Sequence, residues 1–439
     1  MKKILGLLLV AVIAFPASAA VIKNVELTGE VQTIASDVKA NANFMSWLDN
    51  NWYNRGTTTR VLAGLSFDVV EDVKANLLFQ YAYGWGDNNY LNNGFEDAKG
   101  MKLANANLVF SNLFDMLEVT IGRQFYGEDG SPIIYFGPNH YNAEGGLASA
   151  LDAVTVRYSD DTKALTLLAG KVADLSNGFL AAWWNDIEEV RANIWGADFK
   201  LNVADGLTAN VYGYDVTGLD EYWKHEYYED LADDANKHAG VYGAKLGWTN
   251  DTFRASAEYA RNFAGHRLVK EHKDTPYMVK ADIAADIEAF TARGTFLYAK
   301  SANEHYEDSF PFFSLGNYAP GLLIGHRLSA NMEESIFNYS VDGVRMFNIG
   351  VDYKPADQWT VSLDAFSFQG RTGKHAATYE FDVTAKYDYN DYVQLFAGLG
   401  YAKYGNDVYN FAVYNGTDTY KNSFGSENYK GQIGMLVRF

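Results

Sequence analysis

The side chains best suited to enzymatic chemistry are scattered in this sequence. All eight histidines, at positions 140, 225, 238, 266, 272, 305, 326 and 375, fall in segments expected to be loops. Imidazoles beside carboxylates can bind transition metals, but these spacings match no compact ligand motif, and polar loop residues are the simpler account. The sequence also lacks a P-loop, a dinucleotide fingerprint, a Gly-x-Ser-x-Gly elbow and a His-Glu-x-x-His helix. It therefore predicts neither an enzyme nor a bound metal or cofactor.

Charged side chains instead recur at alternate positions of extended segments. In residues 379–389 the odd positions are aromatic or aliphatic, whereas Glu380, Asp382, Thr384, Lys386 and Asp388 take the even ones. Residues 61–69 and 73–83 alternate in the same way. A period of two is typical of β-strands that present one apolar and one polar face. Charges on a wall that faces water would set the selectivity of a channel, which is the chemistry this pattern offers.

The elements that would position these charges are eighteen expected strands. Short turns and long loops alternate between them, as in an up-and-down barrel with both chain ends on the periplasmic side. A β-sandwich would use Greek-key connections instead. The sequence therefore predicts an all-β, antiparallel transmembrane barrel. Strands are expected at 25–36, 57–70, 73–84, 101–111, 116–126, 151–159, 163–174, 190–202, 206–217, 239–249, 252–263, 277–286, 288–300, 344–354, 357–368, 379–390, 392–403 and 428–439. The stretch 277–300 also contains strong helix formers, and losing it as a hairpin would leave sixteen strands.

The first residues predict export. Lys2 and Lys3 precede an apolar stretch at 4–15 and small residues at 16–19, which is the pattern of a signal peptide. Cleavage is expected before Ala20, or alternatively before Val21, leaving 20–439 as a single barrel domain. No later apolar run reaches the roughly 18–20 residues of a transmembrane helix. The formal net charge of −19 argues against a nucleic-acid partner.

Strand parity assigns two groups of charged residues to the inner wall. If these groups occupied opposite arcs, they would create a transverse field across a pore. The basic group is Arg157, Lys200, Lys245, Arg254, Lys280 and Arg293, and the acidic group is Glu26, Glu30, Asp68, Asp352, Asp364, Glu380, Asp382 and Asp388.

Arg123 breaks the parity, because it shares a face with the apolar Ile121. Either it lies at the outer rim, or a bulge at Gly122 turns it inward. The bulge is the favoured expectation, and Arg123 is counted with the pore-lining residues.

The segment 127–150 is rich in glycine and proline, and it contains the apolar cluster Ile133, Ile134, Tyr135 and Phe136. Such a cluster needs to be buried. Folding inward against the wall would bury it and narrow the pore, so the segment is expected to be a constriction loop. Packing against other loops at the mouth, or against another subunit, are the alternatives.

The last segment carries a resemblance. Its alternate residues share one face, and the chain ends on an aromatic side chain; these residues are Tyr429, Gly431, Ile433, Met435, Val437 and Phe439. The pattern resembles the terminal strand by which outer-membrane barrels are recognised by the barrel-assembly machinery. The Gly-Arg-Gln at 122–124, the following loop and the strand at 151–156 resemble the alginate-export family of eighteen-stranded channels, over about 40 residues. Leu151 stands where that family has Phe, and no dense arginine run is present.

These observations favour an outer-membrane porin that passes small hydrophilic solutes by diffusion. The family resemblance implies an alternative, a selective channel for saccharides or an acidic polysaccharide. A third possibility is a closed surface barrel that acts as an adhesin or structural protein. Outer-membrane lipid is the expected surrounding. Eighteen-stranded relatives imply a monomer, and ordinary porins imply a homotrimer.

Overall fold

The computed structural model describes residues 23–42, 52–85, 101–141, 148–172, 192–218, 238–263, 275–301, 312–324, 336–338, 343–371, 377–403, 405 and 424–439. The expected signal peptide lies outside the described residues. Among the helices of the described part, none has the length and apolar character to cross a membrane.

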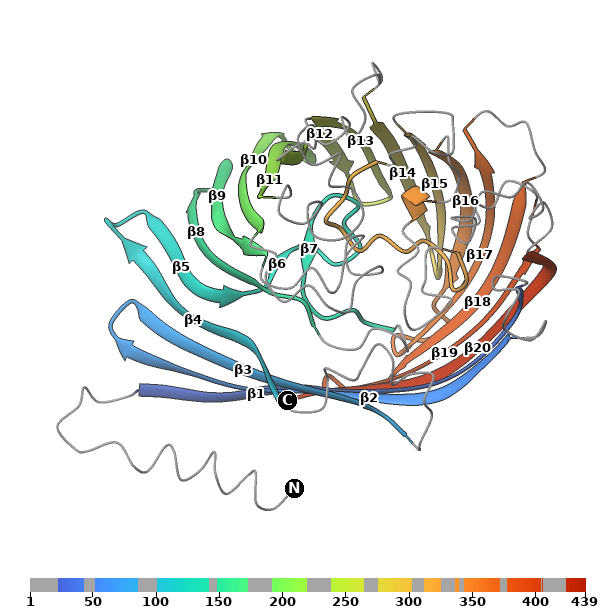
Figure 1. Ribbon diagram of the computed structural model, residues 1–439, viewed down its shortest axis with the longest axis horizontal. Helices are drawn as coiled ribbons and strands as arrows, with labels where there is room; N and C mark the ends of the chain where they lie inside the picture. The colour runs from blue at the N-terminus through green and yellow to red at the C-terminus, as the bar shows by residue number, and fades with distance from the viewer. Residues whose placement is uncertain are drawn as a thin grey trace, which may run out of the picture.

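A single antiparallel sheet of eighteen strands forms the wall. Each wall strand pairs with the next one along the chain, and β1 pairs with both β2 and β20, so the sheet closes on itself (Figure 1). The wall strands are β1 (Lys23–Ala42), β2 (Trp52–Val70), β3 (Val73–Gly84), β4 (Lys102–Leu113), β5 (Leu117–Gln124), β8 (Leu151–Ser159), β9 (Lys163–Val172), β10 (Ala192–Ala204), β11 (Leu207–Thr217), β12 (His238–Thr249), β13 (Phe253–Phe263), β14 (Tyr277–Ile287), β15 (Phe290–Lys300), β16 (Gly343–Tyr353), β17 (Trp359–Gly370), β18 (Thr378–Asp388), β19 (Val393–Lys403) and β20 (Phe424–Arg438).

The prediction of an eighteen-stranded antiparallel barrel is confirmed. The uncertain stretch 277–300 is a hairpin, because β14 and β15 pair along their whole length, from Tyr277 opposite Lys300 to Ile287 opposite Phe290. Its turn is Glu288-Ala289, with Glu288 at φ 52°. The alternation of apolar and polar residues therefore outweighs the helix propensity of this segment, and the sixteen-stranded alternative is excluded.

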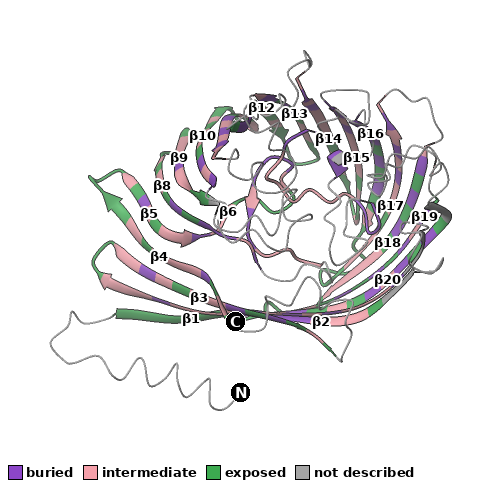
Figure 2. Ribbon diagram, viewed as in Figure 1, coloured by how far each residue is buried: buried purple, intermediate pink, exposed green. Residues whose placement is uncertain are grey.

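The two faces of the wall differ as the alternation predicts. On β16, Phe347 and Ile349 are exposed, whereas Met346 and Asn348, which alternate with them, are buried. The same alternation runs along most strands (Figure 2). Because the exposed set is mostly aliphatic and aromatic, the outer face is mainly apolar, and most charged residues of the strands face inward.

Short turns join the strands at one end of the barrel, and side-chain capping fixes several of them. Asp160, Asn250 and Asn390 each accept hydrogen bonds from the backbone N–H groups two and three residues ahead. Asp and Asn favour such turns because their side chains satisfy backbone donors locally. The turns thereby fix the register of the hairpins that carry the inward-facing charges.

Candidate functional site: two loops inside the barrel

The segment between β5 and β8 folds into the barrel. It contains a small hairpin of β6 (Tyr126–Gly127) and β7 (Tyr135–Phe136), which lies inside the ring of wall strands (Figure 1). Gly127 is required there, because its φ is 88° and a Cβ would lie 2.4 Å from the carbonyl oxygen of Ile134. The hairpin brings an apolar cluster against the inner wall.

Of the four residues expected in the constriction loop, Ile133, Ile134 and Phe136 are buried inside the barrel, and Tyr135 is half-buried. Ile133, Ile134 and Phe136 pack in one apolar cluster with inward-facing wall residues such as Leu151 and Val241. Burial of this surface gives the loop its place, since apolar side chains gain free energy when they leave water.

Polar contacts fasten the end of this loop to β1, β2 and β3. The Gln80 side chain both donates to and accepts from the backbone of Ala148, at 3.1 and 2.7 Å. Arg60 donates to the carbonyl oxygen of Asn139 at 2.9 Å. Gln32 accepts from the backbone N–H of Tyr141 at 3.1 Å. The loop is therefore held to the wall at several consecutive strands.

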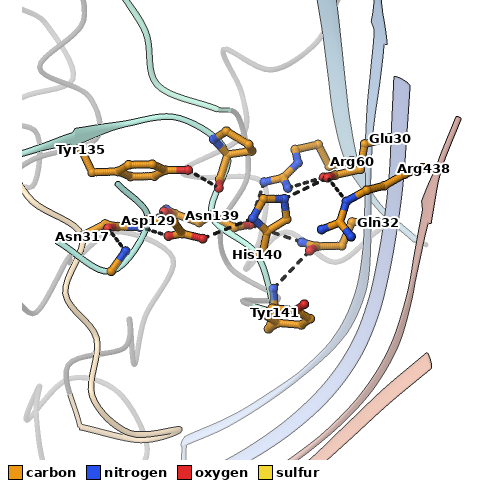
Figure 3. A network of polar contacts seen from close by, with 12 residues as sticks. Glu30, Gln32, Arg60, Asp129, Tyr135, Asn139, His140, Tyr141, Asn317 and Arg438 are labelled. Atoms are coloured by element: carbon orange, nitrogen blue, oxygen red, sulfur yellow. Dashed lines mark hydrogen bonds and ion pairs between the residues drawn. The ribbon is translucent and has the colours of Figure 1, made fainter. Parts of the chain in front are cut away.

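His140 lies at the centre of this attachment (Figure 3). Its Nε2 is 2.9 Å from Glu30 Oε2, and its Nδ1 is 3.2 Å from Asp129 Oδ2. Glu30 also pairs with Arg60 at 2.9 Å and with Arg438 at 3.7 Å. One imidazole thus bridges a wall carboxylate and a loop carboxylate.

The electrostatics of the two loop groups follow from this geometry. Burial lowers the pKa of His140, but its hydrogen bonds to Asp129 and Glu30 outweigh burial, and the net pKa is raised. Burial raises the pKa of Asp129, but the hydrogen bonds from His140 and Asn317 outweigh it, and the net pKa is lowered. The bridge is therefore strongest when the imidazole is protonated and Asp129 is ionised.

A second segment, residues 312–324 between β15 and β16, also lies inside the barrel. It joins the first loop through a parallel bridge between Ile134 and Leu315. Leu315 donates to the carbonyl oxygen of Ile133 at 2.9 Å and accepts from the N–H of Tyr135 at 3.0 Å. Asn317 donates to Asp129 at 2.6 Å. The two loops form one unit, although they come from distant parts of the sequence.

This second segment is anchored on two wall carboxylates. Glu380 accepts from the backbone N–H groups of Leu323 and Ile324 at 2.7 and 2.9 Å, and Asp382 accepts from Leu322 at 2.9 Å. Gly321 allows the approach, because a Cβ there would lie 2.5 Å from Glu380 Oε1. Both carboxylates had been expected to line the pore. They do face inward, but they are buried beneath the segment and hold it in place.

The sequence reasoning missed the inward course of 312–324. The signal that identified 127–150 is present here as well. Glycine and proline punctuate the segment, and its apolar residues Phe312, Phe313, Leu322, Leu323 and Ile324 are all buried in the structure. The predicted strands leave 301–343 as a long loop, but its apolar residues also need to be buried, and this requirement indicates an inward course.

The remaining predicted charges face inward, because they alternate with the exposed apolar residues of their strands. Many are joined to a partner of opposite sign. Arg293 donates to Asp352 at 2.8 Å and to Asp364 at 3.0 Å. The other ion pairs and hydrogen bonds of the predicted residues are Arg254 with Asp286, Lys280 with Asp282, Lys200 with Glu128 of the loop, Glu26 with Lys74, Asp68 with Asn24, and Asp388 with Gln394. Arg157 and Lys245 occupy inward positions on β8 and β12.

The expected separation into a basic and an acidic arc is wrong. Asp282 and Asp286 lie on the arc assigned to bases, and Arg60, Lys386 and Lys430 lie on the arc assigned to acids. Both arcs of the wall therefore carry charges of both signs. The Lys386 ammonium also lies 3.9 Å above the ring of Tyr141 in the first loop.

The expectation for Arg123 is also wrong. The register runs unbroken through Gly122 on both sides, so no bulge turns the chain. Arg123 therefore shares the outer face with Ile121 and pairs with Asp152 at 3.6 Å. Gly122 has a φ of 121°, and the side chain of Gln124 folds back to its carbonyl oxygen at 3.2 Å. The glycine accommodates this local distortion without changing the parity.

The positions of His238 and of the last strand can also be compared with the sequence predictions. His238 begins β12 on the outer face and is bonded to Asp215, so one histidine does lie in a strand. In β20, Tyr429, Ile433, Met435 and Phe439 are all exposed on the outer face, with Gly431 and Val437 at the same parity.

No protein-family model and no curated protein sequence matches this chain. Solved structures do match over almost its whole length. Pseudomonas aeruginosa OccK8 (OprE) aligns with a TM-score of 0.60 and 10% identity, covering 96% of this chain and 99% of that one. Pseudomonas aeruginosa OccD3 (OpdP) aligns with a TM-score of 0.58 and 12% identity, covering 98% and 96%. Acinetobacter baumannii OccAB4 aligns with a TM-score of 0.57 and 10% identity, covering 94% and 98%. At this low identity the likeness establishes the fold: the chain is an eighteen-stranded barrel of the shape shared by the Occ proteins.

Proposed function

We propose that this chain forms a channel in the bacterial outer membrane through which small hydrophilic solutes diffuse. The observation that carries the proposal is the two-sided wall, apolar outside and charged inside. A closed sheet leaves no unpaired strand edge, as lipid requires. Ionised side chains on the inward face need water or partners, and an aqueous interior supplies the water. The solved structures of similar fold include one described as an outer membrane protein, OpdK of Pseudomonas aeruginosa.

The two inward loops are the proposed constriction. They occupy the barrel interior and are joined to each other and to the wall by the contacts of Asp129, His140, Asn317 and Glu380. A solute passing through would meet Lys386, Tyr141 and the ion pairs of Arg293. The constriction residues are thus provided by both loops and by the facing wall.

The charge pattern favours neutral or mixed-charge solutes over long polyanions. Arg293, Arg254 and Lys280 are each bonded to carboxylates, so the wall presents little unbalanced positive charge. A polyuronate would require a surplus of cations to replace its counterions. An alginate-like cargo is therefore less well supported than a small saccharide or another polar metabolite.

Two partner expectations belong to this proposal. The apolar outer face would contact membrane lipid, and the exposed alternate residues of β20 would be presented to the assembly machinery. The backbone N–H and carbonyl groups of Gly29 on β1 form hydrogen bonds with the backbone of Phe439. The terminal aromatic residue therefore also lies where β1 and β20 close the barrel.

Planar-bilayer recording of the purified protein tests the channel. We expect stepwise conductance in potassium chloride, and swelling of protein-containing liposomes in small sugars but not in large dextrans. Heat-unfolded protein is the control. A folded, heat-modifiable barrel that gives neither steps nor swelling would contradict the channel and favour a closed surface barrel. Saturable block of the current by one sugar would indicate a selective channel, whereas a general pore should show none.

A further inference from the structure

The second segment, residues 312–324, is fixed to the wall near both of its ends. Near its start, Phe313 exchanges two hydrogen bonds with the Asn262 side chain on β13, at 2.8 and 3.0 Å. At its end, the N–H groups of residues 322–324 are bound by Glu380 and Asp382 on β18. In the closed sheet β14, β15, β16 and β17 lie between these two strands. The segment therefore bridges two separate parts of the wall.

The middle of this bridge is bound to the first loop by one side chain, that of Asn317 (Figure 3). Its Oδ1 accepts the N–H of Gly130 at 2.8 Å, and its Nδ2 donates to Asp129 at 2.6 Å and to Asn139 Oδ1 at 2.9 Å. Asp129 precedes β7 and Asn139 follows it. Asn317 thus holds the first loop on both sides of its small hairpin.

Backbone contacts strengthen the same junction. The Ser314 hydroxyl donates to the carbonyl oxygen of Pro132 at 2.6 Å, next to the bridge that Leu315 forms with the first loop. If the two loops left the wall separately, these hydrogen bonds and those of Asn317 would all break. If they left together, the bonds would remain. Movement as one body therefore has the lower cost.

The first loop has its own attachment on other strands. The N–H of Tyr141 is bound by Gln32 on β1, and the N–H of Ala148 is bound by Gln80 on β3. The second segment is held by β13 and β18. The amides of Tyr141 and Ala148 can therefore report whether the first loop leaves the wall when the second segment is released.

We propose that the two loops undock from the wall as one body, and that Asn317 is the latch that couples them. Release of the second segment from Glu380 then also frees the first loop from Gln32 and Gln80. The coupling acts equally in the reverse direction, because a coupling free energy between two sites is reciprocal. The loops thereby form a two-part lid that can be released from either side of the barrel. The proposal concerns the docking of the loops and does not depend on conduction through the barrel.

Hydrogen exchange measured by mass spectrometry tests the coupling, under conditions where exchange follows the opening equilibrium. In E380Q, peptides containing Tyr141 or Ala148 should lose the same factor of protection as peptides covering 321–324, roughly 30- to 150-fold. In the N317A background, the further loss that E380Q causes at Tyr141 should be at least about tenfold smaller, since the three hydrogen bonds of the latch are gone. Y318F changes the neighbouring side chain but leaves the latch in place, so it should exchange like the wild type.

Q80L tests the reverse direction, because it removes the attachment of Ala148 on β3. Peptides covering 321–324 should then lose protection together with Ala148. The proposal is overturned if E380Q deprotects 321–324 alone, if Q80L deprotects Ala148 alone, or if Tyr141 responds equally to E380Q with and without Asn317. Heat-modifiable migration on gels first establishes that each variant is folded. If N317A does not fold, N317S takes its place, and the comparison of E380Q with Q80L stands without any change at Asn317.

Discussion

Replacing Glu380 by glutamine should release the 312–324 segment from the wall. Each oxygen of Glu380 accepts one backbone N–H, from Leu323 at 2.7 Å and from Ile324 at 2.9 Å. An amide has one acceptor oxygen, so its NH2 group would face one of these donors. A lost hydrogen bond, together with a buried donor left unsatisfied, costs about 2–3 kcal/mol. Every 1.4 kcal/mol is tenfold in an equilibrium, so undocked segment should become roughly 30- to 150-fold more populated.

Hydrogen exchange measured by mass spectrometry follows this change directly. Peptides covering 321–324 should lose about that factor of protection in E380Q, while peptides from β18 keep theirs because the sheet remains closed. Glu118, an exposed residue on the inward face of β5, provides the matched control, and E118Q should exchange like the wild type. If E380Q leaves the protection of 321–324 unchanged, the carboxylate does not hold the segment, and the anchoring argument fails.

The remaining predictions concern the first loop and the outer face. Because the pKa of His140 is raised, its contribution to loop docking is complete at low pH and is lost as the pH rises through this raised pKa. The pKa of Asp129 is lowered, so its contribution is present at neutral pH and is lost only as the pH falls through that lowered pKa. Open-channel current noise should therefore grow between about pH 6 and about pH 9 in the wild type and stay flat in H140Q; equal noise profiles would refute the role of the bridge. G127V should abolish the protection of the β6–β7 hairpin, since a side chain at positive φ costs about 1–2 kcal/mol and the Cβ also meets the carbonyl of Ile134; wild-type exchange there would disprove it. R123L should leave the reversal potential in a salt gradient unchanged because Arg123 faces outward, whereas K386Q should shift it, and the opposite result would contradict the register. I283R should lower the free energy of unfolding by about 2–4 kcal/mol in lipid vesicles, as determined by urea titration, and an unchanged midpoint would exclude this face from the bilayer.

The strands could be predicted from the sequence because each carries its own signal. Alternation of residues such as those in 379–389 reflects the local geometry of a strand between two different solvents, and no distant contact is needed to see it. The lengths of the connections then fixed the barrel topology. Even the ambiguous 277–300 was decided by its alternating half, Phe290 to Tyr298.

The contents of the barrel were harder to predict because they depend on contacts between distant residues. The burial of Ile133 and Phe136 could be expected from local composition, but their contact with Leu315 could not. The role of Glu380 was mistaken because a charge on an inward position can either face water or hold a loop, and strand parity is the same in both cases. Arg123 was mistaken because a glycine with positive φ can distort a strand without a register shift.

The ion pair between Glu30 and Arg438 has a consequence for biogenesis. These two residues face each other across the seam between the first and last strands, and His140 is bonded to the same Glu30. The seat for the first loop is thus complete only when the two ends of the chain have met. During folding, the first loop can therefore dock fully only after β1 has paired with β20. Docking of this loop would report that the barrel has closed correctly. Mispairing of β1 with β20 would displace the first loop even where the other strand pairs of the sheet had formed.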